Sequence, residues 1–318
     1  MSQTKRKSGA SGGVGKGAGR ALALLGLLAL AAALALAVLR RDDWVVSQCY
    51  FAPWPVPAQA APPPTARLVA FHSADGTGLS GWFVPGGEGS GSKPLVLYLH
   101  GNAGNLDDQW GQFSFLPRWG YDTFALDYRG FGYSLGSPSR TGLLEDCQAA
   151  LAQARSLDPG KPCAVVGFSM GAAYALMLAA RQGGISAVAA LAPFTDFRSI
   201  GVWNLEKMGF PGWAAPCLGW LLVPRGLEPI RSALSRGPED RGLPPLLVVQ
   251  GAADGTIPLW MGEKIAGSWK GPKSLLVMPG YGHGDYFKGP RAGEFRGALE
   301  SLLSKTPYYM EREIPSRG

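Results

Sequence analysis

The stretch Val165-Val166-Gly167-Phe168-Ser169-Met170-Gly171-Ala172-Ala173 joins an apolar run, a Gly-x-Ser-x-Gly turn and a run of small residues. This order predicts a nucleophile elbow, in which a sharp turn between a strand and a helix lifts a serine hydroxyl clear of the sheet. The same template matches at residues 9–13 and 132–136, but in a basic tail and a glycine-rich loop, without a strand before or a helix after. Ser169 is therefore the candidate nucleophile, and the alternative is an ordinary serine at a strand-to-helix turn.

Apolar runs alternate with helix-like segments along the chain on both sides of this turn. The expected strands are Leu68–His72, Gly81–Val84, Leu95–Leu99, Thr123–Leu126, Cys163–Val166, Ala187–Leu191, Leu246–Gln250 and Leu275–Met278. The expected helices are Leu106–Arg118, Arg140–Ser156, Ala172–Gln182, Leu259–Trp269 and Arg291–Ser304. The first two strands form a hairpin across Asp75-Gly76, whereas the later runs are apolar throughout, as in strands covered on both faces. The sequence thus predicts an α/β fold with a mostly parallel, twisted sheet and helices on both faces.

One interval interrupts this alternation. Residues 194–242 contain no clear strand, and we expect them to form a small helical cap inserted in a domain of residues 67–310, with residues 311–318 as a tail. The aromatic residues of the cap either bind an acyl chain or face a membrane, or they pack the cap onto the body. They are Trp203, Phe210, Trp213 and Trp220.

The N-terminal part of the chain predicts a membrane segment. Residues 1–20 read as a basic disordered tail and residues 40–66 as a proline-rich, semi-rigid linker. Between them, residues 21–39 carry no charge, and at about 1.5 Å per residue they would cross a bilayer core as one transmembrane helix. Five cations precede this segment, which favours a catalytic domain on the extracytoplasmic side. Ala35-Leu36-Ala37 offers a cleavage site, so a cleaved signal peptide and a secreted protein are the alternative.

Charge and cysteine content limit the partners that the chain could have. The net charge of +7 is concentrated before and around the apolar segment, so we expect no basic face for nucleic acid. The four cysteines show no metal-ligand spacing. Cys147 and Cys163 fall in an expected helix and strand, which favours buried free thiols, although the pattern leaves a disulfide open.

A serine nucleophile needs a base to take its proton, and the base needs a group that orients it. When a strand-turn-helix elbow carries the serine, the acid and the histidine follow it in that order. Of the three histidines, only His283 comes after Ser169, in the loop after the last expected strand. Asp254, which follows the preceding strand, is the expected acid and would hold the imidazole in the required tautomer. Asp196 also follows a strand end and is the rival acid.

An oxyanion hole needs two preorganised N–H donors. One is expected from Met170, the residue after the nucleophile. The other is expected from the loop of residues 100–105, where Asn102 is the best candidate for the backbone donor. His100 then has a structural role in shaping this loop.

The chain resembles the α/β-hydrolase superfamily in three motifs, His100-Gly101-Asn102-Ala103-Gly104-Asn105, Asp127-Tyr128-Arg129-Gly130-Phe131-Gly132-Tyr133-Ser134 and Gly167-Phe168-Ser169-Met170-Gly171. Within it, the chain is similar to the membrane-anchored serine hydrolases, the group that includes lysophospholipid lipases and protein depalmitoylases. The resemblance covers about residues 67–305. It implies an ester or thioester hydrolase that works through an acyl-enzyme, with an acyl lipid or small-molecule ester as substrate and with no metal or organic cofactor. Asp127 and Arg129 would brace the floor of the site.

Two alternatives to this function stay open. A peptidase of the same fold would need acidic residues near the site to hold a substrate amine, and none stands out in the cap. A catalytically silent, membrane-anchored binding module would not need the serine, acid and histidine that the chain carries in the expected order.

Overall fold

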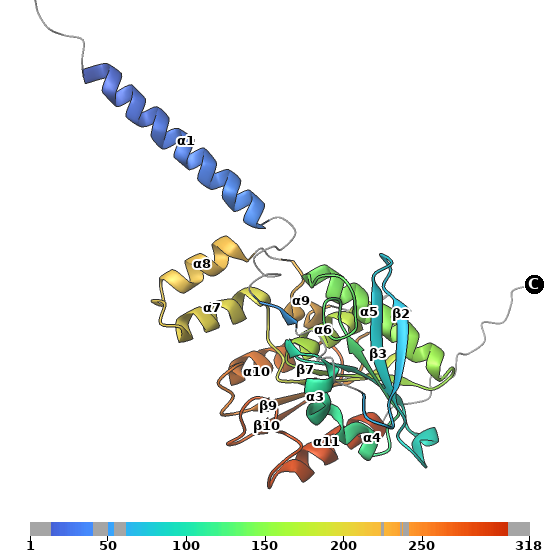
Figure 1. The fold of residues 1–318 in the computed structure, drawn as a ribbon. Coiled ribbons are helices and arrows are strands. Elements are labelled where there is room, and N and C mark those ends of the chain that lie inside the picture. The colour runs from blue at the N-terminus through green and yellow to red at the C-terminus, as the bar shows by residue number, and fades with distance from the viewer. Residues whose placement is uncertain are drawn as a thin grey trace, which may run out of the picture.

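The computed structural model describes residues 14–40, 50–53, 62–223, 226–235, 237 and 242–304. Its centre is an eight-stranded sheet in the order β10-β9-β8-β7-β4-β6-β3-β2 (Figure 1). The strands are β2 Arg67–His72, β3 Gly78–Val84, β4 Leu95–Leu99, β6 Thr123–Asp127, β7 Cys163–Phe168, β8 Ile185–Leu191, β9 Leu246–Gly251 and β10 Lys273–Met278. β2 and β3 pair antiparallel, as does β3 with β6, and the remaining pairs are parallel. The prediction of a mostly parallel sheet that begins with a hairpin is confirmed.

Helices cover both faces of the sheet, and the side chains of β4 show why. Leu95, Leu97 and Leu99 belong to the core beneath α5 Arg140–Leu157, α6 Met170–Ala179 and α10 Leu259–Ser268. Val96 and Tyr98 point the other way, into the core beneath α3 Leu106–Phe113, α4 Phe115–Arg118 and α11 Ala292–Ser304. Because successive side chains of a strand alternate between faces, a strand that is apolar at every position needs a helical layer on each side.

In the part of the cap that the structure describes, three short helices lie between β8 and β9. They are α7 Phe197–Lys207, α8 Ala214–Leu222 and α9 Pro229–Ala233. α7 and α8 pack as a hairpin at one side of the body (Figure 1), and they come so close that a Cβ on Gly219 would lie 2.6 Å from the side chain of Val202. α9 packs instead against α6 and α10. Within its described residues, the insertion is helical, as the sequence predicts.

The N-terminal helix α1 spans Val14–Arg40 and stands away from the body in Figure 1, with α8 among its contacts. It begins inside the segment that was expected to be disordered. In the described part of the chain, no helix has both the length and the apolar character needed to cross a membrane. The predicted transmembrane helix of residues 21–39 is therefore not supported. Residues 1–13 of the tail, the C-terminal tail 311–318 and most of the linker lie outside the described residues.

Arg129, two residues after the end of β6, makes contacts with segments from other parts of the fold. Its backbone N–H and its guanidinium both donate to Asp146 of α5, with distances of 2.8–3.0 Å. Its Nη1 also donates to Asp75 Oδ2 at 2.8 Å, in the β2–β3 turn. The side chain of Asp146 is fully buried and that of Arg129 is 9% exposed. This buried network holds the β2–β3 turn and α5 against the segment that follows β6, so Arg129 has a structural role.

We predict that Asp146→Asn lowers the free energy of unfolding by about 3 kcal/mol or more, because it leaves a buried guanidinium charge without its main partner. Glu145→Gln is the matched control. Its carboxylate is 44% exposed and lies 3.4 Å from Arg129 Nη2, so its loss should cost at most about 1 kcal/mol. Urea denaturation of both variants checks this, and equal costs for the two would contradict it.

Candidate active site

Ser169 forms the turn between β7 and α6 and has φ 55° and ψ −115°. An L-residue rarely adopts a positive φ, so this backbone is strained. The glycines on either side show what imposes the strain. A Cβ on Gly167 would lie 2.3 Å from Gly171 O, and a Cβ on Gly171 would lie 1.9 Å from Leu99 O. The helix therefore starts immediately against β4, and the chain reverses at Ser169.

His283 and Asp254 are in direct contact. His283 Nδ1 lies 2.7 Å from Asp254 Oδ2, and the aspartate side chain is fully buried while the histidine side chain is 21% exposed. Asp254 Oδ1 accepts from the backbone N–H groups of Thr256 and Ile257 at 2.8 and 2.9 Å. Gln250 Nε2 adds a bond of 3.1 Å to Oδ2. These donors fix the carboxylate, so that it can fix the imidazole in turn.

His283 contacts Phe168, the residue before Ser169, which places the histidine close to the serine. The ring of Phe168 lies 4.8 Å from the imidazole of His283, centroid to centroid. Among the described residues, the hydrogen bonds of the site join His283 to Asp254 and not to Ser169. Hydrogen bonds of this kind are often long in a resting enzyme and shorten when substrate binds. The three residues therefore share one edge of the sheet, with the serine 8% exposed.

The rival acid Asp196 has a different role in the structure. It is the N-cap residue of α7, and its carboxylate accepts from Ser199 N and Ser199 Oγ, both at 2.7 Å. Thr195 Oγ1 donates to the same carboxylate at 3.1 Å. These contacts are typical of helix capping.

Both expected oxyanion donors lie in the segments that meet at the elbow. Met170 is the first residue of α6, where the backbone N–H groups have no partner inside the helix. The loop of residues 100–105 approaches Ser169 at Gly101, where a Cβ would lie 3.6 Å from Ser169 Cβ. The side chain of Asn102 points elsewhere, since it donates to Tyr50 O at 2.5 Å and accepts from Ala52 N at 3.2 Å.

His100 and Asp127 form a buried pair beneath this loop. His100 Nδ1 lies 2.6 Å from Gly101 O, and its Nε2 lies 3.7 Å from Asp127 Oδ1. Burial lowers the pKa of His100 to about 4, which keeps the ring neutral. Burial also raises the pKa of Asp127 to about 7, although Leu106 N donates to its carboxylate at 2.9 Å. The pair shapes the loop, in line with the structural roles that the sequence predicts for both residues.

The aromatic residues of the cap do not form a single wall. Trp203 is half-buried and packs against the core. Phe210, Trp213 and Trp220 are exposed by 41%, 77% and 62%. Of the two interpretations of the cap aromatics, packing onto the body therefore fits Trp203, and a surface open to an apolar partner fits the other three.

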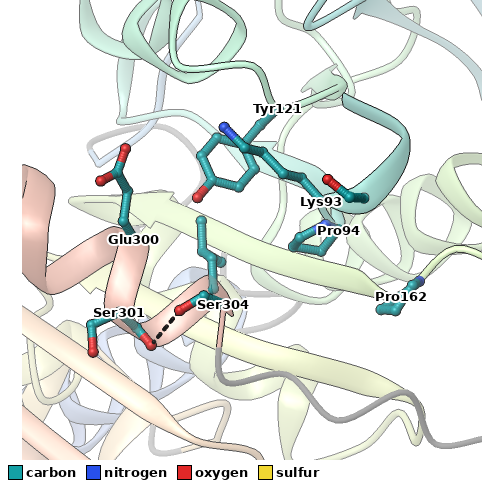
Figure 2. Close-up of a pocket in the computed structure, with 9 residues that line it drawn as sticks. Lys93, Pro94, Tyr121, Pro162, Glu300, Ser301 and Ser304 are labelled. Carbon is teal, nitrogen blue, oxygen red and sulfur yellow. Dashed lines mark hydrogen bonds between the residues drawn. The ribbon is translucent and has the colours of Figure 1, made fainter. Parts of the chain in front are cut away.

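Figure 2 shows residues that line a separate cavity, which has a volume of about 640 Å³. Its lining residues Pro94, Tyr121 and Pro162 come before β4, β6 and β7, so it opens at the amino ends of the strands. The candidate catalytic residues all follow the carboxyl ends. Lys93 beside the cavity donates to Trp119 O at 2.5 Å. The cavity is therefore not part of the candidate active site.

Two contributions to the site are not apparent from the sequence. Gln250, inside β9, donates a hydrogen bond to the carboxylate of Asp254. In the sequence, Gln250 is only a single polar residue in an otherwise apolar strand. The segment of residues 50–53 lies against the loop of residues 100–105, which we call the oxyanion loop after its expected role, although the segment belongs to the predicted linker. Phe51 is 6% exposed, and the adjacent aromatic pair Tyr50-Phe51 is the signal that could have indicated a docked segment. Cys147 and Cys163 are buried free thiols, as predicted.

The chain is similar to several known proteins. A family model described as alpha/beta hydrolase fold matches residues 94–222. The uncharacterized protein YfhR of Escherichia coli (strain K12) is 32% identical over 247 residues, which are 76% of this chain and 81% of that protein. Lysophosphatidylserine lipase ABHD12 of Xenopus tropicalis is 28% identical over 240 residues, which are 68% of this chain and 59% of that protein.

A solved structure adds to these likenesses. The esterase Pf2001 of Pyrococcus furiosus superposes with a TM-score of 0.64 at 20% sequence identity, covering 80% of this chain and 98% of that chain. At this identity the likeness shows the fold alone.

The raised pKa of Asp127 predicts a pH dependence of stability. Between about pH 4 and about pH 7, the Asp127 carboxyl is protonated in the folded protein and ionised in the unfolded chain. The free energy of unfolding therefore falls as pH rises through that window. Asp127→Asn cannot ionise, so the stability of the variant relative to the wild type should rise with pH between those limits. Urea denaturation across the window checks this, and a constant difference would contradict it.

Asp122 provides the control, with the opposite sign. Burial acts to raise its pKa, but its bonds to Lys161 Nζ and Gly86 N lower it below the ordinary value. Its contribution to stability is therefore present above the unfolded pKa and lost as pH falls. For Asp122→Asn the stability relative to the wild type should accordingly rise as the solution becomes acidic.

Proposed function

The chain belongs to the α/β-hydrolase superfamily, and we propose that it is a serine hydrolase that cleaves carboxylic ester or thioester bonds through an acyl-enzyme. The observation that carries the proposal is the 2.7 Å contact between His283 Nδ1 and Asp254 Oδ2, made beside a serine with strained backbone. Strain of this kind costs about 1–3 kcal/mol and is retained mainly where function needs it. A serine at an ordinary turn would not need to bear this cost.

The proposed reaction has two halves. His283 takes the proton of Ser169 Oγ as this oxygen attacks the substrate carbonyl, and the backbone N–H groups of Met170 and Asn102 stabilise the oxyanion. His283 then gives the proton to the leaving alcohol or thiol, which leaves the acyl group on Ser169. Water attacks this ester with His283 again as the base, and the acid product departs. Asp254 stabilises the imidazolium through its contact with His283 Nδ1.

We propose acyl lipids as the substrate class. The likeness to a lysophosphatidylserine lipase supports this, as does the surface of the cap. Met208, Phe210 and Trp213, in and beside the α7–α8 turn, are exposed by 75%, 41% and 77%. Apolar surface gathered in this way is typical of a contact with protein or membrane. A cap with such a surface could take up acyl chains from a membrane.

We further propose that the N-terminal segment holds the enzyme at a membrane, with the catalytic domain on the extracytoplasmic side. Leucines of α1 are exposed by 56–64%, and α1 contacts α8, the helix that carries the exposed Trp220. The cations before the apolar segment support the orientation. If the segment is cleaved, the protein is instead secreted. Protease added to intact cells tests the orientation. If the whole catalytic domain is protected from the protease, the proposed orientation is refuted.

We predict that a fluorophosphonate probe labels the wild type and not Ser169→Ala. Asp254→Asn should lower kcat by about 10⁴-fold, because the imidazole then loses its tautomer and its counter-charge. Asp196→Asn is the matched control and should stay within about twofold of wild type, because asparagine also caps helices. Labelling that persists in Ser169→Ala would refute the assignment of Ser169 as the nucleophile. A wild type that the probe does not label would favour the catalytically silent binding module.

The lipid proposal predicts faster turnover of long-chain than of acetyl p-nitrophenyl esters. It also predicts that Trp213→Ser lowers hydrolysis of a long-chain ester in phosphatidylcholine vesicles by about tenfold, since burial of one such side chain contributes about 1.5–3 kcal/mol. Turnover of the soluble butyrate ester should not change. Leu68→Ser is the control, because Leu68 is 48% exposed but lies in the edge strand β2. A preference for acetyl esters, or equal effects of the two variants, would refute the proposal.

A further inference from the structure

The segment Tyr50–Pro53, which we call the strap, is attached to the loop that would hold the oxyanion. Ala52 and Pro53 form the two-residue strand β1, which pairs in parallel with β5, Ala103–Gly104. The side chain of Asn102 binds the strap at two points. It donates to Tyr50 O at 2.5 Å and accepts from Ala52 N at 3.2 Å. About fifty residues of chain separate the two partners, so this contact is a feature of the tertiary fold.

The strap is anchored by aromatic side chains at the root of the cap. Phe51 is 6% exposed. The ring of Tyr50 meets the rings of Phe194 and Phe197 edge-on, with centroid distances of 6.1 and 5.2 Å. Both phenylalanines precede or begin α7. The strap therefore contacts the oxyanion loop on one side and the start of the cap on the other.

The oxyanion loop needs such a support. Asn102 lies between Gly101, which is pressed against Phe168, and Gly104, which has φ +80°. Glycine backbone is freer than that of other residues, whereas an oxyanion donor must be held in place before the reaction begins. An amide fits this task because it supplies a donor and an acceptor at once, matched to a carbonyl and an N–H two residues apart on the strap.

We propose that the strap is a positioning element of the active site. The two hydrogen bonds between the Asn102 side chain and the strap fix the orientation of the loop backbone. This inference rests on the proposed serine hydrolase function. Asn102 then has two separable roles. Its backbone N–H would face the oxyanion, and its side chain would hold the backbone in that direction through the strap.

The test breaks the contact from each side, with one substitution in the strap and one in the loop. Ala52→Pro removes the N–H that Asn102 Oδ1 accepts, and Asn102→Asp keeps the shape of the side chain but loses the donor to Tyr50 O. Each should lower kcat for p-nitrophenyl butyrate by about 10- to 100-fold, since small misplacements of catalytic groups have effects of that size. KM should stay within about threefold. A purely structural defect would instead reduce the amount of active enzyme, as titration with a fluorophosphonate would show.

Gln109→Ala is the matched control. Gln109 Nε2 donates to Ala103 O at 2.7 Å in an exposed position, so this variant removes a bond to the same loop without altering the strap. Its kcat should stay within about twofold of wild type. If Gln109→Ala lowers kcat as much as Ala52→Pro does, then the loss of any hydrogen bond to the loop lowers kcat, and the strap has no special role.

Hydrogen exchange of residues 101–104 gives a readout that does not depend on activity. Both Ala52→Pro and Asn102→Asp should speed exchange of these amides by about tenfold or more, and Gln109→Ala should not. If exchange is unchanged in Ala52→Pro and Asn102→Asp, the proposal that the strap positions the loop is refuted. This conclusion does not depend on which reaction the enzyme catalyses. A wild type that no fluorophosphonate labels would overturn the proposed function, while the exchange data would still decide on the contact.

Discussion

The close approach of α6 to β4 is the constraint on which the site depends. At Gly171 the helix backbone lies so near Leu99 O that a Cβ would sit 1.9 Å from it. The chain therefore leaves β7 and enters α6 without room for a wider turn, and Ser169 takes the strained backbone that this path requires. Burial offsets the strain, because all ten residues of α6 are buried between the sheet, α5 and α9. A packed helix thus holds in place a serine that would relax in a looser fold.

The parallel sheet then determines what lies around the serine. The carboxyl ends of β4, β7, β9 and β10 meet at one edge, so their loops bring together the oxyanion loop, Ser169, Asp254 and His283 from four distant parts of the sequence. Each group is held by a further layer of contacts. Gln250 and two backbone N–H groups hold Asp254, and the strap holds Asn102. The polar contacts of the site therefore depend on residues that do not touch the substrate.

Sequence patterns indicate the strands and most helices because the apolar runs are local. They fail where a single residue or a distant contact decides. Pro117 lacks an N–H and prevents one continuous helix over Leu106–Arg118, so the structure has α3 and α4 with Ser114 between them. β10 begins at Lys273, two residues before its apolar run. The order of serine, acid and histidine makes the candidate triad visible in the sequence. The aromatic pair Tyr50-Phe51 could indicate that this segment docks, but its pairing partner is not visible, because the pairing joins residues about fifty positions apart.

The central claim is that Ser169 carries the acyl group during turnover. Rapid quenching of the protein with a p-nitrophenyl ester, followed by mass spectrometry of its peptides, tests this directly. The account predicts a mass increase equal to the acyl group, on the peptide that contains Ser169 and on the serine itself. Steady turnover with the acyl group on another residue, or with no acylated peptide when product release shows a burst, would contradict it.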